Sequence, residues 1–283
     1  MVRARHIIVS VLIVFIGACA AFAQTPATTD KADAMWEAAR KGDAATVKKL
    51  LDEGVDVNTK YRYGASALSY ACDRGNLEVV KLLLDRGADA NVRDTFYRAT
   101  PLTWAVSPAM GRKPEHAEIV GLLLKHGAQG KDSALMAAIA APDAPTTKVI
   151  LESGGLTAST LSGALEAAKK ANRSEIVALL EKAGAKPLVE VKMTAAELAR
   201  YVGTYRGTGP AAAVQLNVTV AGERLGASLN GQPMTLVARD QTTFGVAEQP
   251  ITTVTFALAG DKATTVTFNA AGNTIAFTRV EDK

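Results

Sequence analysis

Aromatic and arginine side chains gather in two short stretches of the first half of this chain, although aromatic residues make up only 5% of the sequence. Such side chains anchor protein interfaces because they combine a large contact area with directional hydrogen bonds. We interpret them as a site for a protein partner; the alternative is that the rings pack against one another while the arginines stay solvated. The candidate binding residues are Tyr61, Arg62, Tyr63, Arg93, Phe96, Tyr97, Arg98 and Trp104.

Catalytic chemistry has little support in the sequence. Beyond residue 23 there are two histidines: His116 falls where it can cap a helix, and His126 lies at a helix end, where a cation favours the helix dipole. Cys72 is the single cysteine of that region, so it pairs with no other and is expected to fill the core. No activated-nucleophile motif, phosphate-binding loop or zinc set appears. We therefore expect no enzyme activity, no cofactor and no metal.

Residues 64–91 have the pattern of two short packed helices. Ser66 can cap the first helix by accepting backbone N–H bonds, and Ala71-Cys72 is a small pair that lets two helices approach. Gly75 suits the left-handed conformation that closes a helix. The aliphatic residues 79–84 then form the second helix, whose face must be covered by a neighbouring unit.

The same pattern recurs along the chain. The closing glycines Gly54 and Gly87 are 33 residues apart, and a third copy carries Thr100-Pro101-Leu102-Thr103. In these residues the chain resembles the ankyrin repeat, with its Thr-Pro-Leu-His motif and its period. The resemblance implies a solenoid of stacked helix pairs with a projecting finger between neighbours. Two degenerate copies follow, so we expect five helical pairs over residues 31–186.

The copies are uneven in a way that bears on binding. Residues 54–67 and 87–101 are full-length connections, here called the first and second fingers, whereas the next two connections are shortened turns. The third repeat carries an insertion at residues 107–113, SPAMGRK, which we expect to be a loop because Pro108 and Gly111 break helices. Recognition through finger tips is therefore expected at the two fingers.

The first 23 residues have the layout of a secretory signal peptide, with two arginines, an apolar run and Ala21-Phe22-Ala23. Cleavage after Ala23 predicts a periplasmic or secreted protein with no membrane span, and residues 24–30 then form a tether. The alternative is a lipoprotein acylated on Cys19, because Ile16-Gly17-Ala18-Cys19 resembles a lipobox. Without the signal, 30 basic residues face 28 acidic ones, too even a balance to indicate nucleic acid or an anionic membrane.

Near residue 187 the composition changes to alternating apolar and polar residues separated by glycine turns. We expect a linker at residues 187–192 and a small β domain at residues 193–281. Thr194-Ala195-Ala196-Glu197 is a capping box for a helix running to about Tyr201. Short strands at this spacing favour an antiparallel small barrel or sandwich. The predicted strands are residues 214–220, 225–229, 234–238, 242–246, 254–258, 266–268 and 275–277.

The start of this domain, residues 198–205, resembles a small β domain appended to bacterial serine hydrolases and peptidases of the β-lactamase type. In that family the domain is an accessory, so no catalytic residues carry over to this chain. Together with the signal peptide, the resemblance implies a bacterial protein.

We thus expect an all-α ankyrin-repeat solenoid followed by an all-β domain, acting as a non-catalytic scaffold that binds a protein through its fingers and inner helices. One alternative is that the barrel binds a small apolar or envelope ligand, with Val218, Leu229, Phe256 and Phe268 facing inward. Another is a regulator associated with an envelope hydrolase. The sequence leaves open the partner, the oligomeric state and the packing of the two domains.

Overall fold

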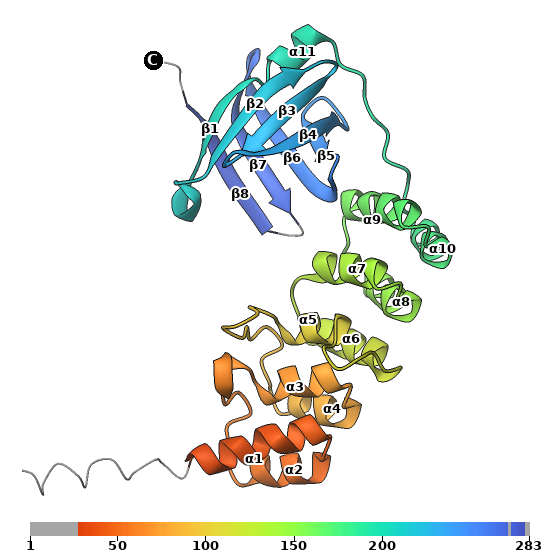
Figure 1. The fold of residues 1–283 in the computed structure, drawn as a ribbon, viewed down its shortest axis with the longest axis vertical. Coiled ribbons are helices and arrows are strands. Elements are labelled where there is room, and N and C mark those ends of the chain that lie inside the picture. The colour runs from red at the N-terminus through yellow and green to blue at the C-terminus, as the bar shows by residue number, and fades with distance from the viewer. Residues whose placement is uncertain (1–27, 271–272, 281–283) are drawn as a thin grey trace, which may run out of the picture.

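The computed structural model describes residues 28–270 and 273–280, which form a stack of helix pairs followed by a β barrel (Figure 1). The predicted signal peptide and the predicted lipidation site Cys19 lie outside the described residues. Helix α1 starts at Thr28, inside the stretch predicted as a tether. The helices of the stack are α1 (Thr28–Lys41), α2 (Ala44–Asp52), α3 (Ala67–Arg74), α4 (Leu77–Asp85), α5 (Pro101–Val106), α6 (Glu115–Lys125), α7 (Lys131–Ala140), α8 (Ala144–Glu152), α9 (Ala158–Lys170) and α10 (Ser174–Lys182).

The inner helices of the second and third repeats begin where the sequence places a hydroxyl. Ser66 Oγ accepts the backbone N–H of Ser69 at 3.2 Å, and Thr100 Oγ1 accepts that of Thr103 at 3.2 Å. Each cap satisfies a donor that the first helical turn leaves unpaired. Gly75 ends α3 in the left-handed conformation with φ +66°. Both caps and this glycine behave as predicted.

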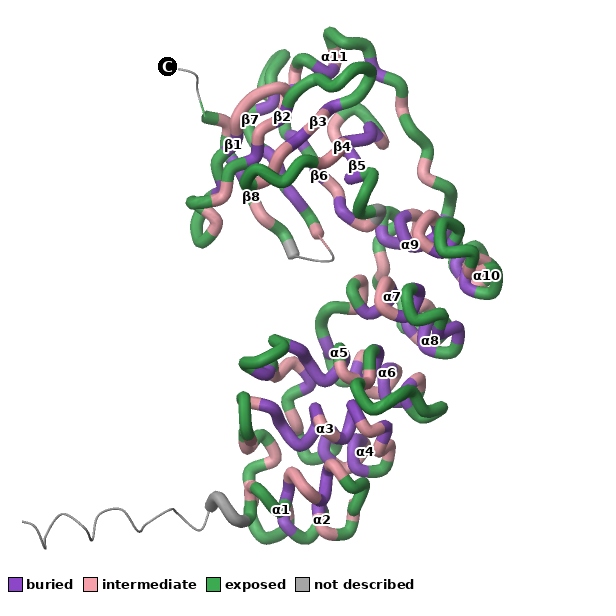
Figure 2. The backbone as a smooth tube through the Cα atoms, viewed as in Figure 1, coloured by how far each residue is buried: buried purple, intermediate pink, exposed green. Residues whose placement is uncertain are grey.

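Each repeat buries its apolar face against the next, as a solenoid requires. Figure 2 shows buried positions running through the whole stack and the barrel, whereas the fingers and the insertion are largely exposed. Ala71 and Cys72 are fully buried in this shared core. This burial confirms the expected role of Cys72 as a core residue, and it also raises the pKa of the Cys72 thiol.

Asparagines join neighbouring repeats at the base of the fingers. Asn58 Nδ2 donates to the carbonyl of Gly87 at 3.3 Å, and Asn58 Oδ1 accepts the N–H of Asp89 at 2.8 Å. Asn91 repeats both contacts in the next repeat, at 3.1 and 2.8 Å. These hydrogen bonds fix the position of each finger base relative to the next repeat.

Polar side chains at the start of the outer helices also reach back to the preceding repeat. His116 is fully buried; its Nδ1 accepts the N–H of Lys113 at 2.8 Å, which leaves Nε2–H to donate to the carbonyl of Asp73 at 3.3 Å. Asn76 holds the corresponding position one repeat earlier and donates to the carbonyl of Ala39 at 2.8 Å. The structural role expected of His116 is confirmed, and it extends across two repeats.

The insertion at residues 107–113 is the predicted loop, and it connects three repeats. The N–H of Ala109 donates to the carboxylate of Asp73 in the preceding repeat at 2.7 Å. Arg112 donates to the buried carboxylate of Asp143 in the following repeat and to the carbonyl of Val106 in its own. The loop is therefore anchored at both ends.

We expect Arg112→Ala to lower the free energy of unfolding by about 2 kcal/mol, because it leaves the buried Asp143 without its cation. The guanidinium is partly exposed, which reduces the cost below that of a fully buried pair. Urea unfolding measures the loss, and Lys125→Ala, at an exposed site on α6, serves as the control. Equal stability of the Arg112 variant and the wild type would contradict this role.

In the described residues the C-terminal part is a closed antiparallel barrel of eight strands, in which each strand pairs with its neighbours in sequence and β8 returns to β1. The capping box of Thr194 and Glu197 starts helix α11 (Ala195–Ala199) as predicted. Strand β1 is missing from the predicted set, because three residues between Gly203 and Gly207 are too few to show alternation. The strands are β1 (Gly203–Gly207), β2 (Gln215–Ala221), β3 (Arg224–Leu229), β4 (Gln232–Ala238), β5 (Thr243–Val246), β6 (Gln249–Ala259), β7 (Lys262–Ala270) and β8 (Asn273–Arg279).

Side chains fill the interior of the barrel. Four aromatic rings meet there with centroids 5.0–5.9 Å apart. Of the residues expected to face a ligand, Val218, Phe256 and Phe268 are buried in this core, and Leu229 packs against it half-buried. This packing favours a structural core over a ligand cavity. The four rings are Tyr201, Tyr205, Phe244 and Phe256.

The barrel packs on the end of the helical stack. Strand β6 lies against α9, the inner helix of the last repeat, where a further repeat would otherwise continue the stack (Figure 1). Burial lowers the pKa of Arg239 in the barrel, and the carboxylates of Glu190 in the linker and Glu166 in α9 oppose that shift. The barrel thus lies where a terminal repeat lies in other solenoids.

Candidate partner-binding groove

The two fingers project on the same side of the stack and are joined by their backbones (Figure 1). The N–H of Tyr61 donates to the carbonyl of Ala65 at 2.7 Å, which closes the first finger. The N–H of Thr95 in the second finger donates to the carbonyl of Tyr63 at 2.6 Å. Tyr63 itself lies in the left-handed region with φ +57°, a conformation that costs a non-glycine residue about 1 kcal/mol.

Asp94 organises the tip of the second finger. Its buried carboxylate accepts the N–H groups of four consecutive residues, 96 to 99, at 3.0, 2.6, 3.1 and 3.2 Å. The backbone of the tip therefore curls around the carboxylate, and Phe96 and Tyr97 are left on the surface. Aspartate commonly closes turns by binding backbone N–H groups ahead of it in this way.

One group of rings packs against the inner helices. Tyr61 stacks on Trp36 of α1 with centroids 4.3 Å apart and an interplanar angle of 12°. Tyr70 of α3 meets Trp36 edge-on at 5.3 Å. Tyr61 is half-buried by these contacts, so it supports the first finger as well as lying on the predicted binding face.

A second group of four rings joins the two fingers to α5, and three of the four are exposed. Tyr63, Phe96, Tyr97 and Trp104 form a chain with successive centroid distances of 5.4, 4.6 and 5.4 Å. Although these rings touch, Tyr63, Phe96 and Tyr97 remain 64%, 64% and 68% exposed. Exposed apolar side chains that gather in one place mark an interaction surface more often than scattered ones do.

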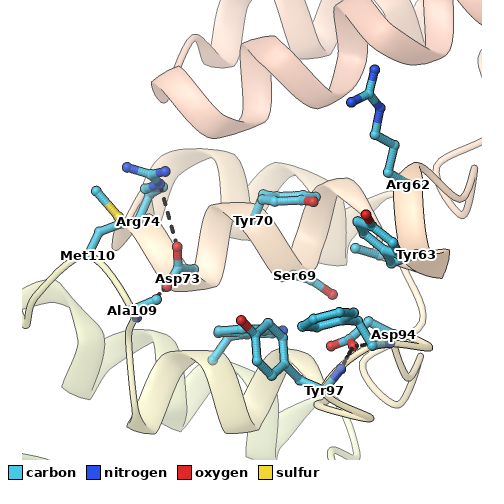
Figure 3. A pocket seen from close by; sticks show the side chains of 13 residues that line it. Arg62, Tyr63, Ser69, Tyr70, Asp73, Arg74, Asp94, Tyr97, Ala109 and Met110 are labelled. Carbon is cyan, nitrogen blue, oxygen red and sulfur yellow. Dashed lines mark hydrogen bonds and ion pairs between the residues drawn. The ribbon is translucent and has the colours of Figure 1, made fainter.

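The exposed rings border a cavity of about 340 Å³, which we call the groove. In Figure 3, Arg62 and Tyr63 lie at one end and Arg74 and Met110 at the other, with helix α3 between them. The groove is lined by Arg62, Tyr63, Ala65, Ser69, Tyr70, Asp73, Arg74, Asp94, Phe96, Tyr97, Trp104, Ala109 and Met110.

Three predicted arginines lie on the fingers, and of these Arg62 lines the groove. Arg62 lies over the Tyr61 ring at 5.8 Å, and Arg93 donates to the carbonyl of Arg98 at 3.3 Å. Within the part of the chain that the structure describes, none of Arg62, Arg93 and Arg98 forms an ion pair. Their charges therefore remain available to a carboxylate from outside.

The structure brings five of the eight predicted binding residues to the groove, leaving out Tyr61, Arg93 and Arg98. Sequence reasoning missed Tyr70 and Met110. Tyr70 precedes Trp104 by 34 residues, about one repeat, so the same solvent-facing position of the inner helix carries a ring twice. Met110 lies in the insertion, whose position relative to α3 follows only from the Ala109–Asp73 contact.

A family model of ankyrin repeats, in three copies, matches residues 35–132. This stretch contains the second half of α1, all of α2 to α6, both fingers and the whole groove. Residues 35–132 therefore match ankyrin repeats, the helix pairs continue in the same arrangement to residue 182, and an eight-stranded barrel follows in the described residues. A search of curated proteins found no match to the chain.

Two further observations concern the described residues alone. None of their helices has the length and apolar character needed to cross a membrane. Across residues 28–270 and 273–280, no group of three or more histidine, cysteine, aspartate or glutamate side chains is arranged to hold a metal ion.

Proposed function

We propose that this protein is a non-catalytic scaffold of the bacterial periplasm that binds a protein partner in the groove between its two fingers and its inner helices. Ankyrin repeats support a role in protein–protein interaction. The identity of the partner stays outside the proposal.

One observation carries it, namely the distribution of aromatic residues. All seven aromatic residues between residues 31 and 186 lie on the fingers or inner helices of the first three repeats, and none is among the buried residues of the solenoid core. Tyr63, Phe96 and Tyr97 are about two thirds exposed, whereas the other four rings are half-buried and Trp104 packs against that core. The seven are Trp36, Tyr61, Tyr63, Tyr70, Phe96, Tyr97 and Trp104.

The double variant Phe96→Ala with Tyr97→Ala tests the site. Both rings are about two thirds exposed, so their removal should leave the thermal unfolding temperature nearly unchanged. Loss of an anchor worth about 2 kcal/mol weakens binding roughly 30-fold. Affinity capture from periplasmic extract compares the variant with the wild type and with Val220→Ala, at an exposed site on the barrel. Capture of the same proteins in equal amounts by all three would refute the proposal.

The periplasmic location is proposed from the signal peptide alone. N-terminal sequencing of the exported protein should begin at Gln24, one residue after the expected cleavage site. Incorporation of palmitate at Cys19 would instead establish the lipoprotein alternative.

A further inference from the structure

The charged side chains of the groove indicate which kind of ligand it can bind. Its two lining carboxylates are both engaged within the protein. Asp94 accepts the four N–H groups of the second finger, and Asp73 accepts the N–H of Ala109 at 2.7 Å. Neither is left to attract a basic side chain from a partner.

The two arginines that line the groove have fewer partners within the protein than the two carboxylates have. Arg62, at the finger end, forms no ion pair within the described residues. Arg74, at the other end, has its Nε 3.5 Å from the Asp73 carboxylate, yet this Nε is buried without a hydrogen-bond partner in the described structure. Arginine at each end, with apolar and aromatic side chains between, favours an occupant that carries negative charge on both sides of an apolar group.

The spacing of the two arginines fits a short extended segment. Arg62 precedes α3 and Arg74 ends it, and Figure 3 shows them at opposite ends of the groove. A helix of eight residues is roughly 12 Å long. An extended chain rises about 3.3 Å per residue, so about four residues run the length of α3, and Arg62 lies just beyond its start.

Resting on the proposed function, we infer that the groove takes an extended acidic segment of a protein, with a large apolar or aromatic side chain flanked on both sides by carboxylates about four residues apart. The apolar side chain enters between Tyr70, Tyr97 and Trp104. One carboxylate meets Arg62 and the other meets Arg74. Single-stranded nucleic acid also uses arginine and aromatic rings, but it needs a continuous row of cations along its backbone, and here the middle of the groove is apolar.

The test selects peptides from a random heptapeptide display library on the full protein. Peptides that also bind the Phe96→Ala, Tyr97→Ala double variant are removed. We expect the retained peptides to combine an aromatic or large aliphatic residue with glutamate or aspartate on both sides. A synthetic peptide of that consensus should bind about tenfold more weakly to Arg62→Glu than to wild type, and should bind Arg206→Glu, altered at an exposed site on β1, as tightly as wild type. Its affinity should also fall as salt is raised.

The outcomes separate this inference from the proposed function. Retained peptides that are neutral or basic would contradict the inference that the ligand is acidic, but they would still support protein binding at the groove. If no peptide is retained once those that bind the double variant have been removed, both are overturned. A labelled oligothymidine that displaces the selected peptides and binds more tightly than they do would overturn the inference in favour of nucleic acid.

Discussion

Replacing Asp94 with alanine is expected to destabilise the protein by roughly 3 kcal/mol and to remove partner binding at the groove. The carboxylate accepts four backbone N–H groups and Asp94 as a whole is 5% exposed, so its loss leaves several donors of the finger tip without a partner. A hydrogen bond to a charged group contributes about 1.5–3 kcal/mol, and the freed tip recovers part of that loss by turning toward water. Phe96 and Tyr97 would then lose their fixed positions.

Asp94→Asn should lie between the wild type and the alanine variant. Three of the four N–H groups bind Oδ1, which an amide oxygen can replace, although without the negative charge. Asp85→Ala, at an exposed site on the neighbouring helix α4, is the matched control. Urea unfolding and titration of the groove-binding peptide give the two readouts. Unchanged stability and affinity in Asp94→Ala would show that the finger tip holds its shape without the carboxylate.

Replacing His116 with alanine is expected to cost roughly 3 kcal/mol, because the ring is fully buried and binds groups in two repeats. Its neighbour Gly75 offers a sharper test. A Cβ at residue 75 would lie 2.9 Å from His116 Cε1, and φ at this position is +66°. Gly75→Ala alone should therefore cost about 2 kcal/mol from backbone strain and crowding.

The double variant Gly75→Ala with His116→Ala should be less destabilised than the sum of the single variants, because removal of the ring relieves the crowding but not the strain. Urea unfolding followed by circular dichroism measures all three. Gly54→Ala is a control of similar backbone strain, with φ +87°, whose Cβ would have no heavy atom within 4 Å. Strict additivity at residues 75 and 116 would show that the ring does not constrain the glycine.

The sequence predicted the structure well at positions where a residue type has one common local role, such as capping or ending a helix. Ser66 and Thr100 cap helices, Gly75 closes one, and Pro108 with Gly111 confines the insertion to a loop, so the five helical pairs follow from offsets along the chain. The barrel follows less completely, because β1 offers only three residues between two glycines. Its closure depends on the pairing of β1 with β8, which local patterns do not encode.

The types of residue in the groove could be predicted from the sequence, but the packing of their side chains and the shape of the finger tip could not. Exposed rings and arginines at the fingers indicate binding, and their positions follow from the repeat period. The sequence does not reveal that Tyr61 stacks on Trp36 while Tyr97 stays exposed, since both are tyrosines of a finger. The role of Asp94 depends on how a turn of five residues folds around one carboxylate. The position of Met110 at one end of the groove depends on a long-range contact between the insertion and α3.

The separation of the rings has a spectroscopic consequence. The chain contains two tryptophans, Trp36 and Trp104, and both lie on the inner face of the first three repeats, whereas the aromatic core of the barrel contains tyrosine and phenylalanine. Emission excited at the red edge of the absorption band therefore originates from the helical stack alone. The protein carries an intrinsic fluorophore beside its groove, so occupancy of the groove can be followed in the unlabelled chain.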